Sequence, residues 1–351
     1  MIGIIYCNEH NMCPYLNKYT DSLEENNIEY KVLLWNRTGD GKSYPDNYII
    51  YRKESELYIP KWKKIGAFIG YTRFLYQEIK IQKFDKLIML TTLPTVICSP
   101  MLLKRYRGKY IYDFRDMSFE KYVPFRKLVE KLVIESYFTC MSSPGYKTTV
   151  KGLTISSHNF RRSDLDNQTS EFKPIGDRIR LLHIGIARGE EYNKRLANLF
   201  GNDERFEIQI VGTGNDTKSF KEYIRSYHNI TVSGTYNNDE KMRYINQCDA
   251  LLYYYPCSYN NNRALANKYY DGMIYKKPLI GNINTYSGKR VEKNGLGISV
   301  DISDDNVPDL VYNYLSNIDV DSYMENVNRE LQSVIKEDDE YLKKIDEFIL
   351  S

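Results

Sequence analysis

The chain has 351 residues, 42% of them hydrophobic and 27% charged, and its net charge is +3. These values are typical of a folded protein of about two domains, and they exclude a disordered chain and a strongly basic nucleic-acid-binding protein. Its six cysteines are scattered without nearby histidines, which predicts neither a zinc site nor a disulfide framework and indicates a reducing cytoplasm. No apolar run reaches the ~18 residues of a membrane span, and no basic leader precedes the first predicted strand, so we expect neither a span nor a signal peptide. The 33 tyrosines suit a half-wet sugar-binding groove, although a biased genome composition would also produce them.

The first half of the chain is predicted to alternate strands with helices, as in a parallel α/β sheet. Residues 8–14, which follow the first strand, include no glycine, so the fingerprint of NAD-type dinucleotide enzymes is absent. The expected strands are 3–7, 30–35, 49–51, 86–90, 109–113, 138–141 and 154–156, and the expected helices are 17–26, 60–84, 96–103 and 128–137.

The predicted helix 60–84 is amphipathic and basic, with six lysines and arginines against a single acidic residue, Glu78. A basic amphipathic helix that also carries Trp62 and Phe68 can lie on an anionic bilayer surface. A helix that packs on the core and exposes a solvated basic face explains the same pattern, so both interpretations stay open.

A linker is predicted over 159–178, which is polar and poor in large apolar residues and contains Pro174 and Gly176. We therefore expect an N-terminal Rossmann-like domain over 1–158 and a C-terminal Rossmann-like domain over 179–335. The final helix, 336–351, is expected to pack back on the N-terminal domain.

The second half repeats the strand–helix alternation, and three successive strands end in glycine. Gly185 follows the first of these strands, Gly212 and Gly214 follow the second, and Gly234 follows the third. Glycine at the same relative place predicts a close approach of the backbone to something at one edge of the sheet. The expected strands are 181–184, 206–211, 230–232, 250–255, 279–280 and 297–300, and the expected helices are 190–200, 218–227, 239–247, 264–275, 307–315, 321–335 and 338–350.

The stretch from Cys248 to Gly281 is the centre of this second half. An apolar strand breaks at Pro256 into a polar, asparagine-rich loop, and a helix then leads to another apolar strand. A polar loop between the carboxyl end of a parallel strand and a helix N-terminus is where α/β proteins bind anions and nucleotides.

Three charged residues follow the predicted strand 109–113 in the first domain. Asp113, Arg115 and Asp116 stand at the carboxyl end of that strand, where a functional site is expected. A structural ion pair between Arg115 and a neighbouring carboxylate is the alternative for these residues.

Taken together, these segments resemble GT-B glycosyltransferases, and within them the retaining, nucleotide-sugar-dependent transferases of capsule, exopolysaccharide and lipopolysaccharide synthesis (glycosyltransferase family 4-like). The matching pieces are 185–194, 233–236 followed by 239–240, 248–250, and 267–271 followed by 277–280. The resemblance covers nearly the whole chain. It implies two Rossmann-like parallel-sheet domains that face each other across a cleft, the first for the acceptor and the second for the donor.

The resemblance also implies roles for residues of the donor domain. Gly185, Arg188 and Lys194 match the spacing of the residues that hold the donor diphosphate, and Asp271 occupies the place of the acidic residue that binds the ribose hydroxyls. Surface cations and a helix-stabilising role are the alternatives for the charged and polar members of the set. The remaining members are Gly212, Gly214, Gly234 and Tyr236 along the base, and Asn267 and Lys268 at the loop and diphosphate.

In the first domain, the resemblance implies that Asp113, Arg115 and Asp116 face the cleft, where one aspartate orients or deprotonates the acceptor hydroxyl. One position departs from the family pattern: Arg263 stands where an acidic residue faces the transferred sugar. That departure puts the identity of the sugar in question. The pairs Asp164–Asp166 and Asp319–Asp321 are better explained by linker polarity and a helix N-cap than by metal binding.

The resulting expectation is a cytoplasmic glycosyltransferase that uses a UDP-sugar and needs no metal or other cofactor. Its acceptor is expected to be a growing, lipid-linked glycan of bacterial surface polysaccharide, with peripheral contact to the inner face of the cell membrane and no nucleic-acid partner. Two alternatives stay open: a nucleotide-sugar 2-epimerase, and a non-catalytic sugar-nucleotide-binding or scaffold subunit of a capsule assembly complex.

Overall fold

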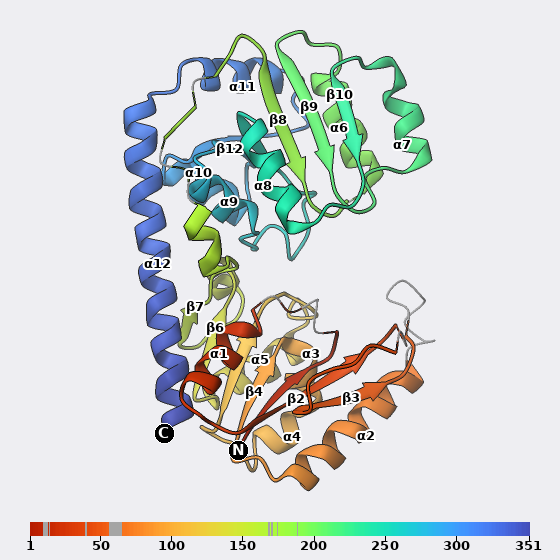
Figure 1. Cartoon of the computed structure of the whole chain (residues 1–351), viewed down its shortest axis with the longest axis vertical. Helices are drawn as coiled ribbons and strands as arrows, with labels where there is room; N and C mark the ends of the chain where they lie inside the picture. Colours follow the sequence, from red (N-terminus) through yellow and green to blue (C-terminus); the bar gives the residue numbers. More distant parts are fainter. Residues whose placement is uncertain are drawn as a thin grey trace. The chain divides into compact units, whose positions relative to one another are not determined.

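The computed structural model describes residues 1–9, 13, 15–38, 41–55, 65–167, 169, 171–173, 175–187 and 189–351. The chain forms two compact units, each built on a parallel sheet (Figure 1). Unit 1 comprises Met1–His158 together with Lys336–Ser351, and unit 2 comprises Asn159–Ile335. The predicted fold class, α/β with two parallel sheets, is confirmed.

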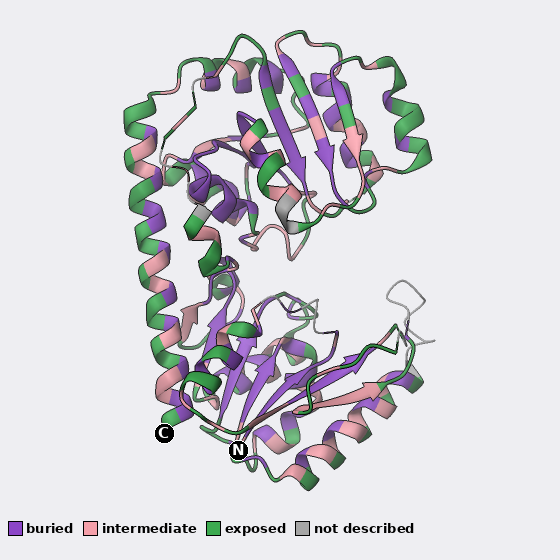
Figure 2. Cartoon of the chain, viewed as in Figure 1, coloured by how far each residue is buried: buried purple, intermediate pink, exposed green. Residues whose placement is uncertain are grey.

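The sheet of unit 1 has seven parallel strands in the order β3-β2-β1-β4-β5-β6-β7. Its strands are apolar and largely buried, as Figure 2 shows, because helices cover both faces of a parallel sheet. The strands are β1 (Ile2–Tyr6), β2 (Tyr30–Asn36), β3 (Tyr48–Arg52), β4 (Lys86–Leu90), β5 (Tyr110–Phe114), β6 (Phe138–Met141) and β7 (Thr154–Ser156).

The described helices of unit 1 pack their apolar sides on this sheet. Helix α2 buries Ala67, Tyr71, Leu75 and Ile79, one residue per helical turn, so its described part is a core-facing helix. Residues 60–64 of the predicted basic helix lie outside the described residues. The helices are α1 (Asn17–Glu25), α2 (Ile65–Gln82), α3 (Thr92–Ile97), α4 (Ser99–Leu102), α5 (Val123–Ile134) and the short 3-10 helix η3 (Pro144–Thr148).

The sheet of unit 2 has six parallel strands in the order β10-β9-β8-β11-β12-β13. Alternate residues of each strand enter two separate hydrophobic clusters: Leu181 packs under α6, whereas Leu182 packs under α9. The strands are β8 (Ile179–Ile184), β9 (Phe206–Val211), β10 (Ile230–Ser233), β11 (Ala250–Tyr253), β12 (Leu279–Asn282) and β13 (Gly297–Val300).

Two groups of helices cover the two faces of this sheet. Helices α6, α7 and α11 contribute to one hydrophobic cluster, and α8, α9, α10 and the first half of α12 contribute to the other. The helices are η4 (Arg162–Asn167), α6 (Glu190–Phe200), α7 (Lys218–Tyr223), η5 (Ile224–Ser226), α8 (Asn238–Gln247), α9 (Lys268–Ile274), α10 (Tyr286–Lys293) and α11 (Val307–Ser316).

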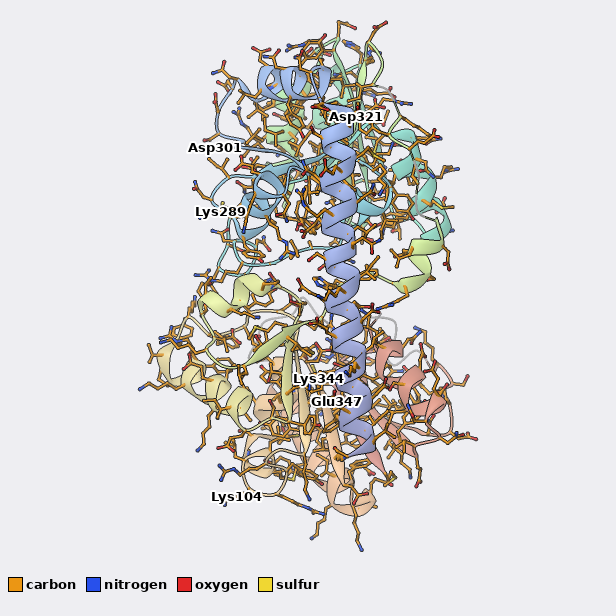
Figure 3. All side chains as sticks on the ribbon, turned by 90° about the vertical axis from the view of Figure 1, so that its left-hand side faces the viewer. Lys104, Lys289, Asp301, Asp321, Lys344 and Glu347 are labelled. Carbon is orange, nitrogen blue, oxygen red and sulfur yellow. The ribbon has the colours of Figure 1, made fainter. Side chains whose placement is uncertain are left out.

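The last helix, α12 (Val320–Leu350), is continuous, whereas two helices separated at 336–337 were expected. Its exposed and buried residues alternate along its length (Figure 2), and the Lys344–Glu347 pair at its exposed side is labelled in Figure 3. Residues up to Ile335 belong to unit 2 and the remainder to unit 1. Among the described residues, no helix combines the length and apolarity that crossing a membrane requires.

Candidate functional site

The topology of unit 2 identifies one edge of its sheet as the place for a ligand. Strands β8 and β11 are neighbours, and the chain continues from them in opposite directions across the sheet. The loops after two such strands diverge and leave a crevice at their carboxyl ends, which is where doubly wound α/β proteins bind ligands. In unit 2, those loops begin at Gly185 and Tyr254.

The predicted glycines lie at this edge, but they serve different purposes. A Cβ on Gly212 would overlap the carbonyl oxygen of Gly185. A glycine is therefore required at 212 because the backbone of Gly185 passes close to it. A Cβ on Gly185 would instead meet only Lys268, with Nζ at 3.9 Å, among described residues other than its chain neighbours. Gly214 lies against Ala187, and Gly234 lies against the carboxylate of Asp216. Of the four glycines, Gly185 is therefore the one that keeps space open for a ligand.

Two buried asparagines fix the loop after β8. The side-chain amide of Asn215 donates to the carbonyl oxygen of Gly185 at 2.8 Å, and Asn193 of α6 donates to Asn215 at 2.9 Å. Both side chains are about 1% exposed. Buried amides that are bonded in this way hold a backbone turn in one conformation.

Lys268 brings a positive charge to the same edge. It is the first residue of α9, only 3% of it is exposed, and its ammonium group lies over Gly185. Nζ donates to the hydroxyl of Tyr255 at 3.2 Å and lies 4.6 Å from the centre of that ring. A buried ammonium group without a paired carboxylate is costly unless an anion accompanies it, so this position suits a phosphate.

Asp271 follows Lys268 by one helical turn and is 5% exposed. Its Oδ1 accepts a hydrogen bond from Lys241 of α8 at 2.6 Å, and no described residue donates to Oδ2. Burial raises the pKa of the Asp271 carboxyl above its ordinary value, and the Lys241 ammonium opposes that rise. One carboxylate oxygen thus remains to accept hydrogen bonds from a ligand, beside a cation one turn away.

The other predicted donor residues are placed as follows. Tyr236 is partly buried and packs edge-on against Tyr244, with ring centres 6.5 Å apart. Asn267 is exposed at the N-terminus of α9, and its side chain makes no capping hydrogen bond. Lys194 lies on α6, where its ammonium group pairs with Glu191 at 2.9 Å and Glu190 at 3.1 Å. Arg188 lies outside the described residues.

The three charged residues predicted in unit 1 include a buried ion pair. Asp113 is fully buried. Nη2 of Arg115 donates to its Oδ2 at 2.8 Å, and Nε of Arg115 lies 2.5 Å from its Oδ1 in an ion pair. Tyr19 also donates to Asp113, at 2.7 Å, and the Arg115 guanidinium lies 3.8 Å from the ring centre of Tyr15. The ion-pair alternative is the arrangement observed for Asp113 and Arg115, whereas Asp116 is exposed. A role of Asp116 towards an acceptor stays a prediction.

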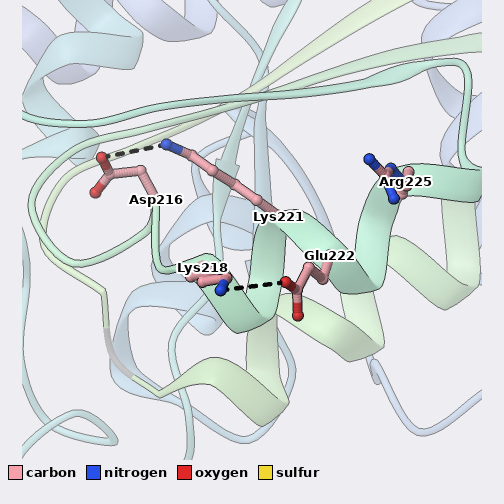
Figure 4. A pocket seen from close by; sticks show the side chains of 5 residues that line it. All are labelled: Asp216, Lys218, Lys221, Glu222 and Arg225. Carbon is pink, nitrogen blue, oxygen red and sulfur yellow. Dashed lines mark ion pairs between the residues drawn. The ribbon is translucent and has the colours of Figure 1, made fainter.

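A pocket of about 440 Å³ lies along α7 of unit 2 (Figure 4). Its charges are largely paired with one another: Lys221 with Asp216 at 3.6 Å, and Lys218 with Glu222 at 3.9 Å. Arg225 completes the lining. Because these pairs neutralise one another, the pocket offers little charge to a ligand. Within the described ranges, no cluster of three or more His, Cys, Asp and Glu side chains is placed to hold a metal ion.

Three residues of the site were not predicted: Lys241, Asn215 and Tyr255. Lys241 lies on a helix that begins with a capping box at Asn237 and Glu240, and nothing in its spacing indicates that its side chain meets Asp271 thirty residues away. Asn215 directly follows the Gly212–Gly214 turn, and that adjacency is the one signal that could have identified it.

Comparison with known proteins gives no sequence relative. No family model matches the chain, and no curated protein matches it. Many solved structures, however, are similar to it over nearly its whole length.

Three of these structures illustrate the similarity. Sucrose-phosphate synthase from Thermosynechococcus elongatus is 12% identical with a TM-score of 0.67, over 95% of this chain and 94% of that one. Anabaena HepE, solved in complex with UDP and glucose, is 10% identical with a TM-score of 0.67, over 99% and 100%. WaaG, a glycosyltransferase involved in lipopolysaccharide biosynthesis, is 9% identical with a TM-score of 0.62, over 98% and 99%. The chain therefore has the fold of the GT-B glycosyltransferases.

Proposed function

We propose that this chain is a glycosyltransferase that takes its sugar from a nucleotide-sugar, most simply a UDP-sugar, bound by unit 2. The observation that carries the proposal is the placement of two buried charged residues on α9: Lys268 lies over Gly185, and Asp271 lies one turn further along the helix. A phosphate-binding cation and a hydroxyl-binding carboxylate at that separation suit the diphosphate and the ribose of one nucleotide. The GT-B fold and the UDP in the HepE complex support this assignment.

The chemistry proposed for the site follows from where charge develops. When the glycosidic bond to the nucleotide breaks, negative charge grows on the leaving diphosphate, and a fixed cation such as Lys268 stabilises it. Retention of configuration by front-face displacement requires no protein nucleophile. We propose a retaining transfer of this kind. We also propose that neither a metal nor another cofactor takes part, since Lys268 supplies the cation at the diphosphate.

The proposed acceptor is a growing glycan of bacterial surface polysaccharide, linked to a lipid. The similarity to WaaG, a glycosyltransferase involved in lipopolysaccharide biosynthesis, supports this context. Peripheral contact with the membrane is proposed for the outer face of α2, where Ile69, Arg73, Lys80 and Ile81 are exposed.

The test is calorimetric titration of the whole chain with UDP, GDP and CMP in the presence of EDTA, followed by a panel of UDP-sugars. We expect saturable binding of UDP with tighter binding of one UDP-sugar, and slow release of UDP from that sugar. If no nucleotide binds, the donor-site assignment is wrong. If UDP binds but no UDP-sugar is ever turned over, with or without lipid-linked glycan, the chain is the non-catalytic subunit instead.

A further inference from the structure

Unit 1 contains a half-buried arginine, Arg37, whose guanidinium pairs with no carboxylate of the described residues. Arg37 directly follows β2, at the carboxyl edge of the sheet, and its guanidinium makes no hydrogen bond or ion pair with any described residue. Its Nε is buried without a partner. Burial lowers the pKa of Arg37 below its ordinary value, and neighbouring acidic groups, Glu9 among them, oppose this fall.

Aromatic rings hold this guanidinium in place. Arg37 lies 4.2 Å from the ring centre of Trp35 and 5.5 Å from that of Phe68. Trp35 is itself fully buried and stacks on Tyr71 with ring centres 5.0 Å apart. A cation fixed on an aromatic platform loses little conformational entropy when it binds an anion.

The carboxylate of Glu9 acts on Arg37 electrostatically but makes its contacts elsewhere. Its Oε1 accepts hydrogen bonds from the backbone amides of Arg37 at 3.3 Å and Thr38 at 3.0 Å, and its Oε2 lies 3.9 Å from the ammonium group of Lys42. Glu9 therefore positions the backbone beneath Arg37 without pairing with the guanidinium.

Two further buried polar atoms that lack a hydrogen-bond partner among the described residues stand on the chain segments that flank Arg37. They are Oδ1 of Asn8, which follows β1, and Oγ of Ser55, which follows β3 and is 5% exposed. Strands β3, β2 and β1 are neighbours in that order, and the backbone amide of Ser55 donates to the carbonyl oxygen of Arg37 at 3.0 Å. Three unsatisfied polar atoms on adjacent segments indicate a missing polar partner.

The backbone at this edge is also unusual. Thr91 directly follows β4, the strand next to β1, and has φ +76°, a conformation that is rare for a β-branched residue. Cys7, which precedes Asn8, has its Sγ 4.0 Å from the Thr91 hydroxyl. Strands β1 and β4 form the switch point of the unit 1 sheet, as β8 and β11 do in unit 2. Strain that persists at such a point is a common mark of a binding site.

Two other arginines in the described part of the chain each have a carboxylate within ion-pair distance. Arg115 pairs with Asp113 at 2.5 Å, and Arg290 pairs with Glu330 at 2.6 Å. Among the described residues, a carboxylate thus pairs with each of these two arginines and none pairs with Arg37.

We propose that unit 1 binds an oxyanion on Arg37, and that this oxyanion is a phosphate or carboxylate group carried by the acceptor glycan, with Asn8 and Ser55 bonding its neighbouring hydroxyls. Two N–H groups of a guanidinium match either oxyanion. The identification with the acceptor rests on the proposed transferase function, whereas the oxyanion site itself does not.

The test uses Trp35 as a built-in reporter. The chain has two tryptophans, so Trp62→Phe leaves Trp35, beside Arg37, as the only tryptophan, and its fluorescence is excited selectively over that of the tyrosines. This protein is titrated with inorganic phosphate, glucuronate and neutral glucose at constant ionic strength, with UDP present in excess so that unit 2 is occupied. We expect saturable fluorescence changes with phosphate or glucuronate and none with glucose, and the tighter of the two anions identifies the group.

The matched variants are Arg37→Gln and Arg73→Gln, which remove one positive charge each from unit 1. Arg37→Gln should weaken anion binding at least about tenfold, and Arg73→Gln should leave it unchanged. Should Arg37→Gln fail to fold, Arg37→Lys keeps the charge without the fork and should still weaken binding severalfold. Equal affinities in the parent and the Arg37 variant, equal losses in both arginine variants, or no response to either anion would each overturn the proposal. UDP affinity, measured in the same samples, reports the proposed function separately.

Discussion

At the scale of single residues, the proposed donor site depends on which cation reaches the open space at Gly185. The resemblance to GT-B glycosyltransferases implies Lys194 as a phosphate-binding cation, but that side chain forms ion pairs with Glu190 and Glu191 on its own helix. Lys268 instead lies over Gly185, and it has no carboxylate within ion-pair distance among the described residues. An unneutralised, buried cation is worth more to a bound phosphate than an exposed one that is already paired.

Replacing Lys268 with Met should therefore weaken UDP binding by about 1.5–3 kcal/mol, the usual contribution of a hydrogen bond to a charged group. Lys194→Met is the matched control, because it removes the same group from α6, and we expect a smaller loss from it. Calorimetric titration with UDP measures both. A larger loss from the Lys194 variant would transfer the phosphate-binding role to Lys194 and contradict the assignment made from the structure.

The Lys241–Asp271 pair gives a prediction about pH. A ribose hydroxyl donates to the ionised carboxylate, so UDP affinity should fall as pH drops through the pKa of Asp271, which burial holds above its ordinary value. Lys241→Met removes the opposing cation, and the fall should then begin at a higher pH. UDP titrations between about pH 5 and 8 measure this shift, and Lys241→Arg should restore the parent profile. Identical profiles in the parent and Lys241→Met would show that Lys241 does not tune Asp271.

Stability should respond to the same pair. Removing Lys241 leaves a buried carboxylate unpaired, which costs about 3–5 kcal/mol at neutral pH. A carboxyl whose pKa is raised in the folded state stabilises the fold below its unfolded pKa and loses that contribution as pH rises, so the defect of Lys241→Met should shrink in acid. Urea unfolding at two pH values measures this, with Lys241→Met/Asp271→Asn as the control, since the double variant removes both charges and should recover most of the loss.

The contrast between Lys268 and Lys241 shows which site residues a sequence can reveal. Lys268 and Asp271 lie within one short segment, where a strand, a polar loop and a helix follow in an order that α/β proteins use for ligands. Lys241 meets Asp271 only because α8 and α9 cover the same face of the sheet. Such a contact depends on packing between distant segments, and no local pattern encodes it.

At the scale of elements, the strands were the most predictable feature, because short apolar runs bounded by glycine or charged residues mark buried parallel strands. The helices were less predictable than the strands. Helix α10 was not predicted, since Gly288 falls within it and weakens the helical pattern, although Thr285 caps it by accepting from the Gly288 amide at 3.0 Å. The expected break in α12 at 336–337 was wrong, because Lys336 and Glu337, the residues at that position, are good helix formers.

The proposed membrane contact can be tested by changing charges on helix α2. Its buried residues face the core, so a bilayer could be met only by the outer face, where Arg73 and Lys80 flank exposed Ile69 and Ile81. Reversing both charges with Arg73→Glu and Lys80→Glu should reduce sedimentation with anionic vesicles, because about 1 kcal/mol per basic residue is lost and repulsion is added. The control reverses two exposed charges elsewhere in unit 1, Lys104→Glu and Arg105→Glu. Equal sedimentation of the parent and the α2 variant would show that α2 packs on the core and does not bind the membrane.

At the scale of the whole molecule, one helix contributes to two separate cores. The first half of α12 places Tyr323, Val327, Leu331 and Val334 in the core of unit 2, and the second half places Tyr341, Ile345, Phe348 and Ile349 in that of unit 1. The second half is fixed to unit 1 by polar contacts as well. Lys18 bonds the fully buried Asp338 at 2.5 Å, and Lys86 donates to the carbonyl oxygen of Phe348 at 2.6 Å. Each unit therefore depends on a different part of the same element.

This division predicts that a cavity in the second half of α12 will weaken unit 1 selectively. Phe348 is fully buried and packs against Tyr137, so Phe348→Ala should cost about 3–5 kcal/mol. Lys344→Ala, one turn away on the exposed side of the helix, should change stability by less than about 0.5 kcal/mol. Hydrogen exchange resolved by peptide distinguishes the two units: the Phe348 variant should lose protection in β1, β2 and β4, keep it in β8, β9 and β11, and bind UDP as the parent does. An equal loss of protection in both sheets would mean that the two cores unfold as one, and that α12 couples the donor site to the stability of unit 1.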